Sequence, residues 1–186
     1  MPSLRANGYE AIGIDPQAPA SAHYQRAEFE CASLPDQLDA VVASTSLHHV
    51  AEPAQVIDRI VTTLMRGGRL VVVEWAWEKF DKKTAHWCFT RLGPEDEAGW
   101  LHHRRGEWQA SGLQWPNYLR GWAEGERLHR ADELVRLLNK RLQCESLENG
   151  PYFFPDLADT TAAEEQAAID AGVVNATRID WAGSRP

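Results

Sequence analysis

The chain has 186 residues, enough for one domain with a sizeable core, and its formal net charge of -8 gives no long-range attraction to phosphate backbones or anionic lipid headgroups. Nucleic acid and membrane surfaces are therefore disfavoured as partners, and no apolar run approaches the ~20 residues of a membrane-spanning helix or forms a signal-peptide core. Because Cys31, Cys88 and Cys144 are too few and too scattered for a disulfide framework, we expect a cytoplasmic protein with free thiols.

The start of the chain predicts the end of a helix and then a strand. Leu4 to Asn7 has the character of a last helical turn, and Gly8 supplies the left-handed residue that stops it. The run 9–15 is short and apolar and ends in Asp15-Pro16. It therefore predicts a buried strand that stops at a turn.

The next segments indicate the fold class. Residues 27–34 are a weak candidate for a second strand, and residues 38–44 are a stronger third one. Pro53 begins a helix whose apolar residues recur every three or four positions and which ends at Gly67-Gly68. Residues 69–75 then form a strand that is apolar on both faces, as expected where helices cover both sides of a parallel sheet. Strand, helix and strand in this order predict an α/β fold.

Residues 76–129 differ in composition from the rest of the chain, because they hold most of the tryptophans: Trp77, Trp87, Trp100, Trp108, Trp115 and Trp122. We expect a largely helical insertion that forms a lid, with breaks near Gly93-Pro94 and Trp115-Pro116. Most of these rings are expected to pack in a small satellite core. Some could instead form a cage for an organic cation or stack on a flat acceptor.

The last third returns to regular patterns. Residues 132–141 predict an amphipathic helix, and residues 143–154 a strand and turn. A final helix is expected over 162–171, followed by a closing strand over 176–181 at the sheet edge. The whole chain is expected to form a single domain.

Several motifs resemble those of a known family. An acidic residue ends the strand 9–15, Glu30-Cys31-Ala-Ser-Leu-Pro overlaps the second half of the weak strand, and the segment 38–50 ends in Leu-His-His-Val. In order and spacing, residues 4–75 and 130–183 resemble a class I S-adenosylmethionine-dependent methyltransferase from its second strand to its last. Arg66-Gly-Gly stands where many relatives carry Pro-Gly-Gly.

The resemblance implies a Rossmann-like, mostly parallel sheet with helices on both faces, an antiparallel last strand, and S-adenosylmethionine as cofactor. The cofactor-binding residues that it implies are Asp15, Glu30, Cys31, Ser44, Thr45 and His49. Asp15 would accept hydrogen bonds from the ribose hydroxyls, a task that suits a carboxylate at a strand's carboxyl end. The alternative is a turn-forming aspartate before a proline. His48 and His49 either line the pocket or make structural hydrogen bonds.

Relatives place a first strand and a Gly-x-Gly-x-Gly loop ahead of the helix that ends here at Gly8, and this sequence shows neither. A parallel sheet without a central strand exposes two unpaired edges and loses more burial than ~10 kcal/mol of domain stability could absorb. Either the start of the chain is assigned too late, or a partner supplies the strand, or the protein has adapted. The first explanation is favoured, since residues 1–4 fall inside an expected helix.

Methyl transfer to a hydroxyl or ammonium group needs a base. His102 and His103 are candidates for this catalytic role, with His86 as a third, although paired histidines beside two arginines more often form a solvated face. We expect no metal, because His86-x-Cys88 is too tight for the usual zinc-ligand spacing.

The sequence therefore predicts methyl transfer from S-adenosylmethionine to a small-molecule acceptor, which it does not identify. The alternative is a non-catalytic, methyltransferase-like binding or scaffold protein, with an oligomer or a partner chain completing the open sheet. The missing cofactor glycines support this alternative, whereas Asp15 and the His48-His49 loop speak against it.

Overall fold

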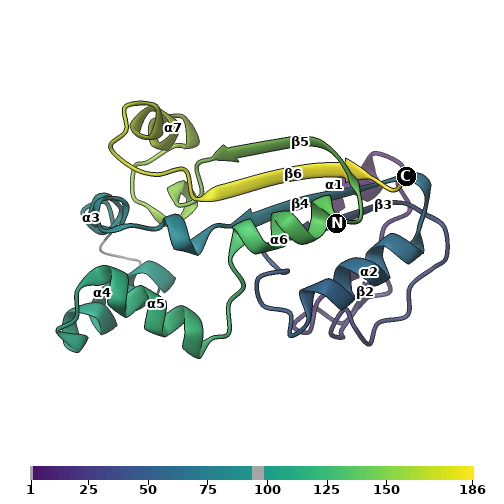
Figure 1. Ribbon diagram of the computed structural model, residues 1–186, viewed down its shortest axis with the longest axis horizontal. Coiled ribbons are helices and arrows are strands. Elements are labelled where there is room, and N and C mark those ends of the chain that lie inside the picture. The colour runs from purple at the N-terminus through teal and green to yellow at the C-terminus, as the bar shows by residue number, and fades with distance from the viewer. Residues whose placement is uncertain (1, 94–98) are drawn as a thin grey trace.

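The computed structural model describes residues 2–93 and 99–186, and its main feature is a four-stranded sheet (Figure 1). The strand order is β3-β4-β6-β5, with bounds β3 Leu38–Ser44, β4 Leu64–Trp75, β6 Arg178–Ser184 and β5 Gln143–Gly150. β3 and β4 are parallel, whereas β6 is antiparallel to both of its neighbours. β3, β4 and β5 therefore run in one direction and β6 runs in the opposite direction, which confirms the predicted α/β sheet.

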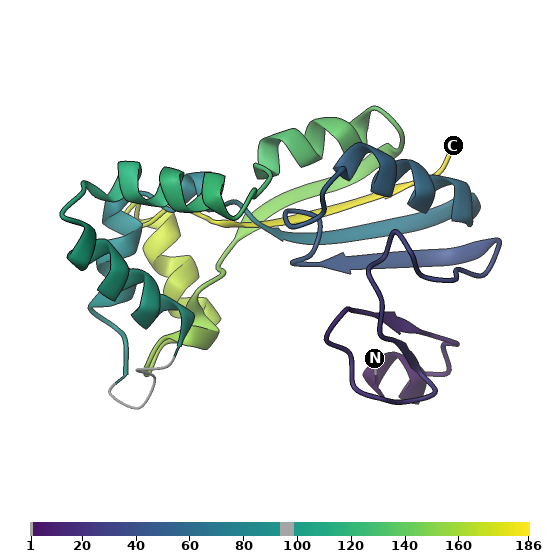
Figure 2. The ribbon, with the colours of Figure 1, turned by 90° about the horizontal axis from the view of Figure 1, so that it is seen from below.

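Two helices cover one face of this sheet (Figure 2). α2 (Pro53–Thr63) begins at the predicted proline, and α6 (Ala131–Asn139) corresponds to the predicted amphipathic helix. Their apolar faces pack on alternate residues of β4 and on Trp181 of β6, where Ile57, Leu70 and Trp181 are almost fully buried. Burying side chains of this size stabilises a fold by about 1.5–3 kcal/mol each, so this face forms one of the two cores.

The opposite face of the sheet is covered less completely. Val42 of β3 lies beside Val71 of β4 in register, and the two side chains are 59% and 36% exposed. Val72, the next residue of β4, points to the helix-covered face and is 1% exposed. Burial therefore alternates along residues 69–73, although the sequence predicted a strand buried on both faces. Both valines of this pair are therefore accessible to solvent.

A small N-terminal lobe lies apart from the four-stranded sheet (Figure 2). It consists of α1 (Pro2–Ala6) and a separate parallel pair formed by β1 (Gly13–Ile14) and β2 (Tyr24–Gln25). α1 ends as predicted, with Gly8 at a φ of 85°. The lobe lies on the side of the sheet opposite α2 and α6, below the edge formed by β3.

The strands of this lobe are shorter than predicted. The expected buried strand 9–15 is reduced to β1, and Ile12 is 50% exposed. The candidate strand 27–34 is wrong, because that segment forms turns and β2 precedes it. Within the described part of the chain β1 pairs only with β2, and β3 is left as an edge strand of the main sheet. Short strands are the physical consequence of having one neighbour instead of two.

β4 begins earlier than predicted. α2 ends at Thr63, four residues before the predicted stop at Gly67-Gly68, and Leu64 is already extended and paired with Leu38. Gly67 has a φ of 74°, and a Cβ at Gly68 would lie 2.9 Å from the carbonyl oxygen of Leu38. The two glycines thus serve an irregularity within the strand and do not end the helix: Gly67 takes the left-handed conformation, and at Gly68 a side chain would not fit.

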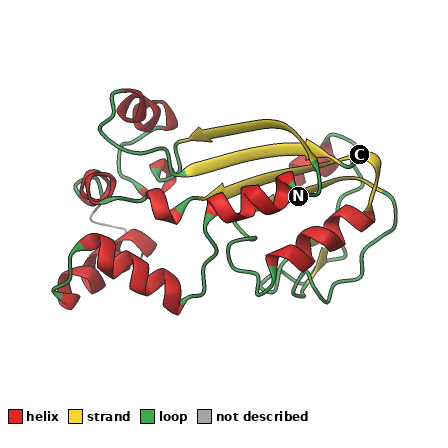
Figure 3. Ribbon diagram, viewed as in Figure 1, coloured by secondary structure: helices red, strands yellow, loops and turns green. Residues whose placement is uncertain are grey.

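Helices gather beyond one end of the sheet (Figure 3). From the segment 76–129 come η1 (Trp77–Lys79), α3 (Lys82–Phe89), α4 (Trp100–Ser111) and α5 (Trp115–Gly125), in agreement with the predicted helical character. The predicted break at Trp115-Pro116 is the start of α5, whereas Pro94 lies outside the described residues. Most of the tryptophans of this segment pack in a second core, as expected.

The C-terminal elements follow the predicted order but not the predicted placement. η3 (Phe154–Asp156) and α7 (Ala162–Asp170) follow β5, and a capping box formed by Thr161 and Glu164 begins α7. β6 lies between β4 and β5, so its predicted position at the sheet edge is wrong. β5 is the edge strand instead, and nearly all of its residues are exposed. None of the helices in the described ranges has the length and apolarity required to cross a membrane.

Candidate functional site

The loop after β3 is held by one buried carboxylate. Glu74 lies near the end of β4 and is 1% exposed. Its Oε1 accepts hydrogen bonds from the backbone N–H groups of Ser46 and Leu47, at 2.9 and 2.6 Å. Its Oε2 lies 2.5 Å from Nδ1 of His48. Because β3 and β4 are parallel neighbours, their carboxyl ends meet, and a side chain of one strand can anchor the loop of the other.

This loop turns sharply and leaves three predicted cofactor residues exposed. Thr45 has a φ of 47°, and its N–H donates to the carbonyl oxygen of Val73 at 2.7 Å. Ser44, Thr45 and His49 are exposed, whereas His48 is buried. The rings of His48 and His49 lie 4.1 Å apart, and partial burial together with His48 lowers the pKa of His49. The neutral imidazole of His49 is therefore favoured.

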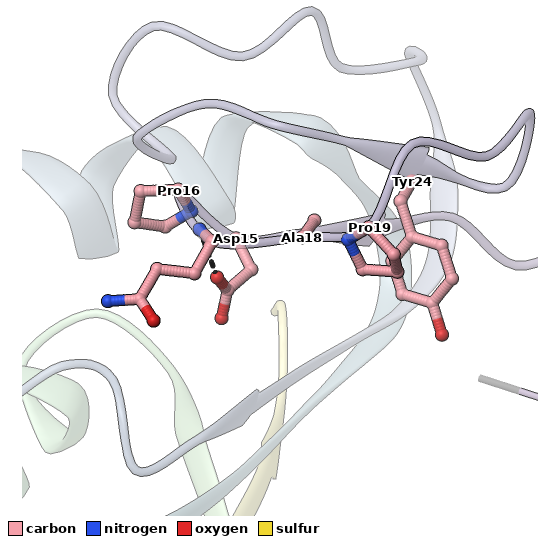
Figure 4. Close-up of a pocket in the computed structure, with 6 residues that line it drawn as sticks. Asp15, Pro16, Ala18, Pro19 and Tyr24 are labelled. Atoms are coloured by element: carbon pink, nitrogen blue, oxygen red, sulfur yellow. Dashed lines mark hydrogen bonds between the residues drawn. The ribbon is translucent and has the colours of Figure 1, made fainter.

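Asp15 follows β1 and lines a concave surface of about 500 Å³ together with Pro16, Gln17, Ala18, Pro19 and Tyr24 (Figure 4). Oδ1 of Asp15 accepts a hydrogen bond from the N–H of Gln17 at 2.6 Å. Among the residues of known placement, none donates to Oδ2. Figure 4 shows the carboxylate of Asp15 and the ring of Tyr24 on the same side of the lobe. Asp15 thus stabilises the turn with one carboxylate oxygen, while the other accepts no hydrogen bond from the described residues.

Glu30 and Cys31 lie in a turn that α2 anchors. Arg59 of α2 donates hydrogen bonds to the carbonyl oxygens of Phe29 and Ala32, and its guanidinium lies 5.4 Å from the centroid of the Phe29 ring. Glu30 and Cys31 are both exposed. Arg59 therefore attaches the segment after β2 to the main sheet unit and places both predicted residues at the surface.

His102 and His103 lie on α4. His103 is exposed, whereas Nδ1 of His102 is buried and has no hydrogen-bond partner in the described part of the chain. The aromatic core connects this helix to the loop after β3, because Trp75 lies 5.1 Å from Trp100 and 6.4 Å from His48, measured between ring centroids. No contact within residues 2–93 and 99–186 brings either predicted base to that loop.

Trp75 is the centre of this aromatic core. Its ring stacks on that of Tyr152, with centroids 5.9 Å apart, and lies 6.1 Å from that of Trp122. Burial, reinforced by the Glu74 and Asp156 carboxylates, raises the pKa of Tyr152 to about 12. The region next to His48 is therefore apolar, with both Trp75 and His48 buried. Within the described ranges, no three His, Cys, Asp or Glu side chains converge in a way that could hold a metal ion.

Sequence reasoning missed Glu74 and Arg59. Glu74 gave a signal in the sequence, because it is a charged residue at the end of an apolar strand. A buried carboxylate needs hydrogen-bond donors, so its position could have predicted a contact with a neighbouring loop. Arg59 gave no such signal. The carbonyl oxygens that it reaches lie 27 and 30 residues away in the chain, and only the folded arrangement brings them to α2.

Comparison with known proteins supports the family. The sequence profile of a methyltransferase domain matches residues 1–144. None of the curated proteins compared with the sequence matches it significantly.

Solved structures show a related fold. An S-adenosylmethionine-dependent methyltransferase from Mesorhizobium loti is 16% identical, with a TM-score of 0.56, over 99% of this chain and 84% of that one. A protein described as an S-adenosylmethionine-dependent methyltransferase from Listeria monocytogenes is 15% identical, with a TM-score of 0.55 and the same coverage of 99% and 84%. N-methyltransferase NodS from Bradyrhizobium japonicum is 13% identical, with a TM-score of 0.46, and 89% of this chain spans 56% of its length. The chain belongs to the methyltransferase domain family and has its Rossmann-like α/β fold.

Proposed function

We propose that this protein transfers a methyl group from S-adenosylmethionine to a small-molecule acceptor. Family membership supports the activity. The observation that carries the cofactor assignment is Asp15, which follows a strand of a parallel pair, lines a concave surface and has one carboxylate oxygen to which no described residue donates. Ligands of open α/β sheets bind outside the carboxyl ends of the strands, and Asp15 holds the corresponding place after β1 in the separate two-stranded pair.

The residues present fit such a cofactor. A carboxylate oxygen accepts hydrogen bonds from ribose hydroxyls, and Glu30 and Cys31 are exposed in the turn after β2. Ser44, Thr45 and His49 are exposed after β3, where the methionine portion is expected. The bound cofactor would supply an electrophilic methyl group, and these side chains would orient it.

We place the acceptor beside the segment 76–129, which we propose to act as a lid within a single domain. The aromatic rings around Trp75 support this assignment, because they offer large apolar area next to the loop after β3. His102 and His103 stay candidates for the base. The cytoplasmic location also stays a prediction; free thiols at Cys31 and Cys144, both exposed, support a reducing compartment.

Calorimetric titration with S-adenosylmethionine and with S-adenosylhomocysteine tests the cofactor assignment. The Asp15→Asn variant should bind about ten- to a hundredfold more weakly, because hydrogen bonds to a charged acceptor contribute about 1.5–3 kcal/mol. The matched control is Asp170→Asn on α7, an exposed aspartate whose Oδ1 accepts from Gln166. Equal affinity of Asp15→Asn and the wild type would contradict the assignment.

A second candidate function is a methyltransferase-like binding protein that joins another chain. The edge position of β3 and the exposed Val42 and Val71 favour it, since such a surface invites a further strand or a partner. Light scattering over a range of protein concentrations separates the two. A stable oligomer without cofactor affinity supports the binding protein, and a monomer that binds the cofactor supports the enzyme.

A further inference from the structure

We infer that Glu74 is a positioning residue that sets the shape of the loop 45–49 for the cofactor. It does so with two hydrogen bonds to the loop backbone and by fixing the ring of His48. The inference rests on the proposed function, because that proposal assigns this loop to the cofactor.

The backbone part of the argument starts from Thr45. Its φ of 47° is unfavourable for a β-branched residue, so surrounding contacts must hold it. The next two N–H groups, those of Ser46 and Leu47, both point to Oε1 of Glu74. A carboxylate that is 1% exposed is costly unless donors satisfy it, and these amides are two of its donors. The strained turn and the buried charge therefore stabilise each other.

The third donor fixes His48. A carboxylate oxygen only accepts hydrogen bonds, so Nδ1 of His48 must carry the proton that lies between it and Oε2 of Glu74. In the neutral ring, Nε2 is then the nitrogen with the free lone pair. Nε2 makes no hydrogen bond with any residue of the described ranges. Glu74 thus selects both the orientation and the tautomer of a histidine next to His49.

The same loop is tied to the segment after α5. The carbonyl oxygen of His48 accepts a hydrogen bond from the N–H of His129 at 3.0 Å, and Nε2 of His129 lies 2.8 Å from the carbonyl oxygen of Val50. Trp77 donates in turn to the carbonyl oxygen of His129. A shift of the loop would therefore also displace the segment around His129, next to the proposed acceptor region. Glu74 binds the loop at three points: the N–H groups of Ser46 and Leu47 and the ring of His48.

The chain contains a matched control for this role. Glu165 is also 1% exposed, and its carboxylate accepts hydrogen bonds from three consecutive backbone N–H groups, those of Tyr152, Phe153 and Phe154. It holds a turn of the other core. Removing either carboxylate takes the acceptor from three donors, some buried and some partly exposed, so the losses of stability should be similar. Of the two carboxylates, only that of Glu74 touches the loop 45–49.

The experiment compares Glu74→Ala and Glu74→Gln with Glu165→Ala and Glu165→Gln. Amide hydrogen exchange of Ser46 and Leu47 reports the anchor, the ¹⁵N shifts of the His48 ring report its tautomer, and calorimetry with S-adenosylhomocysteine reports binding. Glu74→Ala should speed exchange of both amides and weaken binding about tenfold or more. Glu74→Gln keeps the volume and one acceptor oxygen, so it should retain the fold while its NH₂ group forces Nδ1 of His48 to become the acceptor.

Wild-type affinity in Glu74→Ala, unchanged exchange at Ser46 and Leu47, or an equal loss of binding in Glu165→Ala would each overturn the inference. Should Glu74→Ala fail to fold, an unaltered His48 tautomer and wild-type affinity in Glu74→Gln would do the same. Absence of binding by the wild type counts against the proposed function instead, and the exchange and tautomer measurements then decide the role of Glu74.

Discussion

Replacing Val72 by alanine should destabilise the protein far more than replacing Val42. Val72 is 1% exposed beneath α2 and α6, whereas Val42 is 59% exposed on the other face of the same sheet. The substitution removes two methyl groups, which at about 0.8 kcal/mol per buried carbon and with a cavity term amounts to about 2–3 kcal/mol at Val72. At Val42 less than half of the transfer term is lost and no cavity forms, so the cost is about 0.5 kcal/mol.

Urea unfolding followed by circular dichroism measures both losses of stability. The free energy of unfolding should fall with urea concentration at a similar slope in the wild type and the variants. Val71→Ala serves as an internal comparison, because Val71 is 36% exposed and lies beside Val42 in register. A cost at Val42 equal to that at Val72 would refute the reasoning, since it would mean that the open face of the sheet is covered in solution. A dependence of that cost on protein concentration would identify a second copy as the cover.

Two further predictions concern titratable groups. Cys31 and Cys144 are exposed, whereas Cys88 is buried and its burial raises the pKa of the thiol. An aromatic disulfide reagent should therefore modify Cys31 and Cys144 quickly and Cys88 only on unfolding. Fast modification of all three thiols would contradict the burial of Cys88 in the second core. The hydrogen bonds from Thr161 hold the pKa of Glu164 below its ordinary 4.5, so the capping box contributes stability above that pH and loses it as the pH falls. Glu164→Gln should make acid unfolding measured by circular dichroism less steep, and an unchanged pH profile would exclude this contribution.

Much of the fold could be predicted because its signals are local. The bounds of β3 agree with the predicted strand, Pro53 begins α2, and Gly8 and Gly172 follow helices in the left-handed region. These features depend on backbone preferences and apolar periodicity within a few residues, which a sequence displays directly. Asp15 follows a strand, as predicted, although that strand spans only Gly13–Ile14; its role toward the cofactor stays a prediction.

The errors concern pairing between distant segments. β6 pairs with both β4 and β5. β4 begins at Leu64, which pairs with Leu38, and the strand continues through two glycines. The prediction of a strand at 27–34 was wrong, because this segment forms turns and pairs with no strand in the described part of the chain. A local pattern does not say which strand will be a neighbour, and strand length depends on that neighbour.

By itself, the sequence determined the α/β class, the strands and helices of the main sheet unit and the family, because short-range patterns of residues indicate each of them. Only the tertiary structure decided that Glu74 holds the loop 45–49, that Arg59 anchors the turn with Glu30, and that one face of the sheet is left open. Those outcomes arise from contacts between residues 27 to 30 positions apart and from which elements pack on each face of a strand. A local sequence pattern specifies neither.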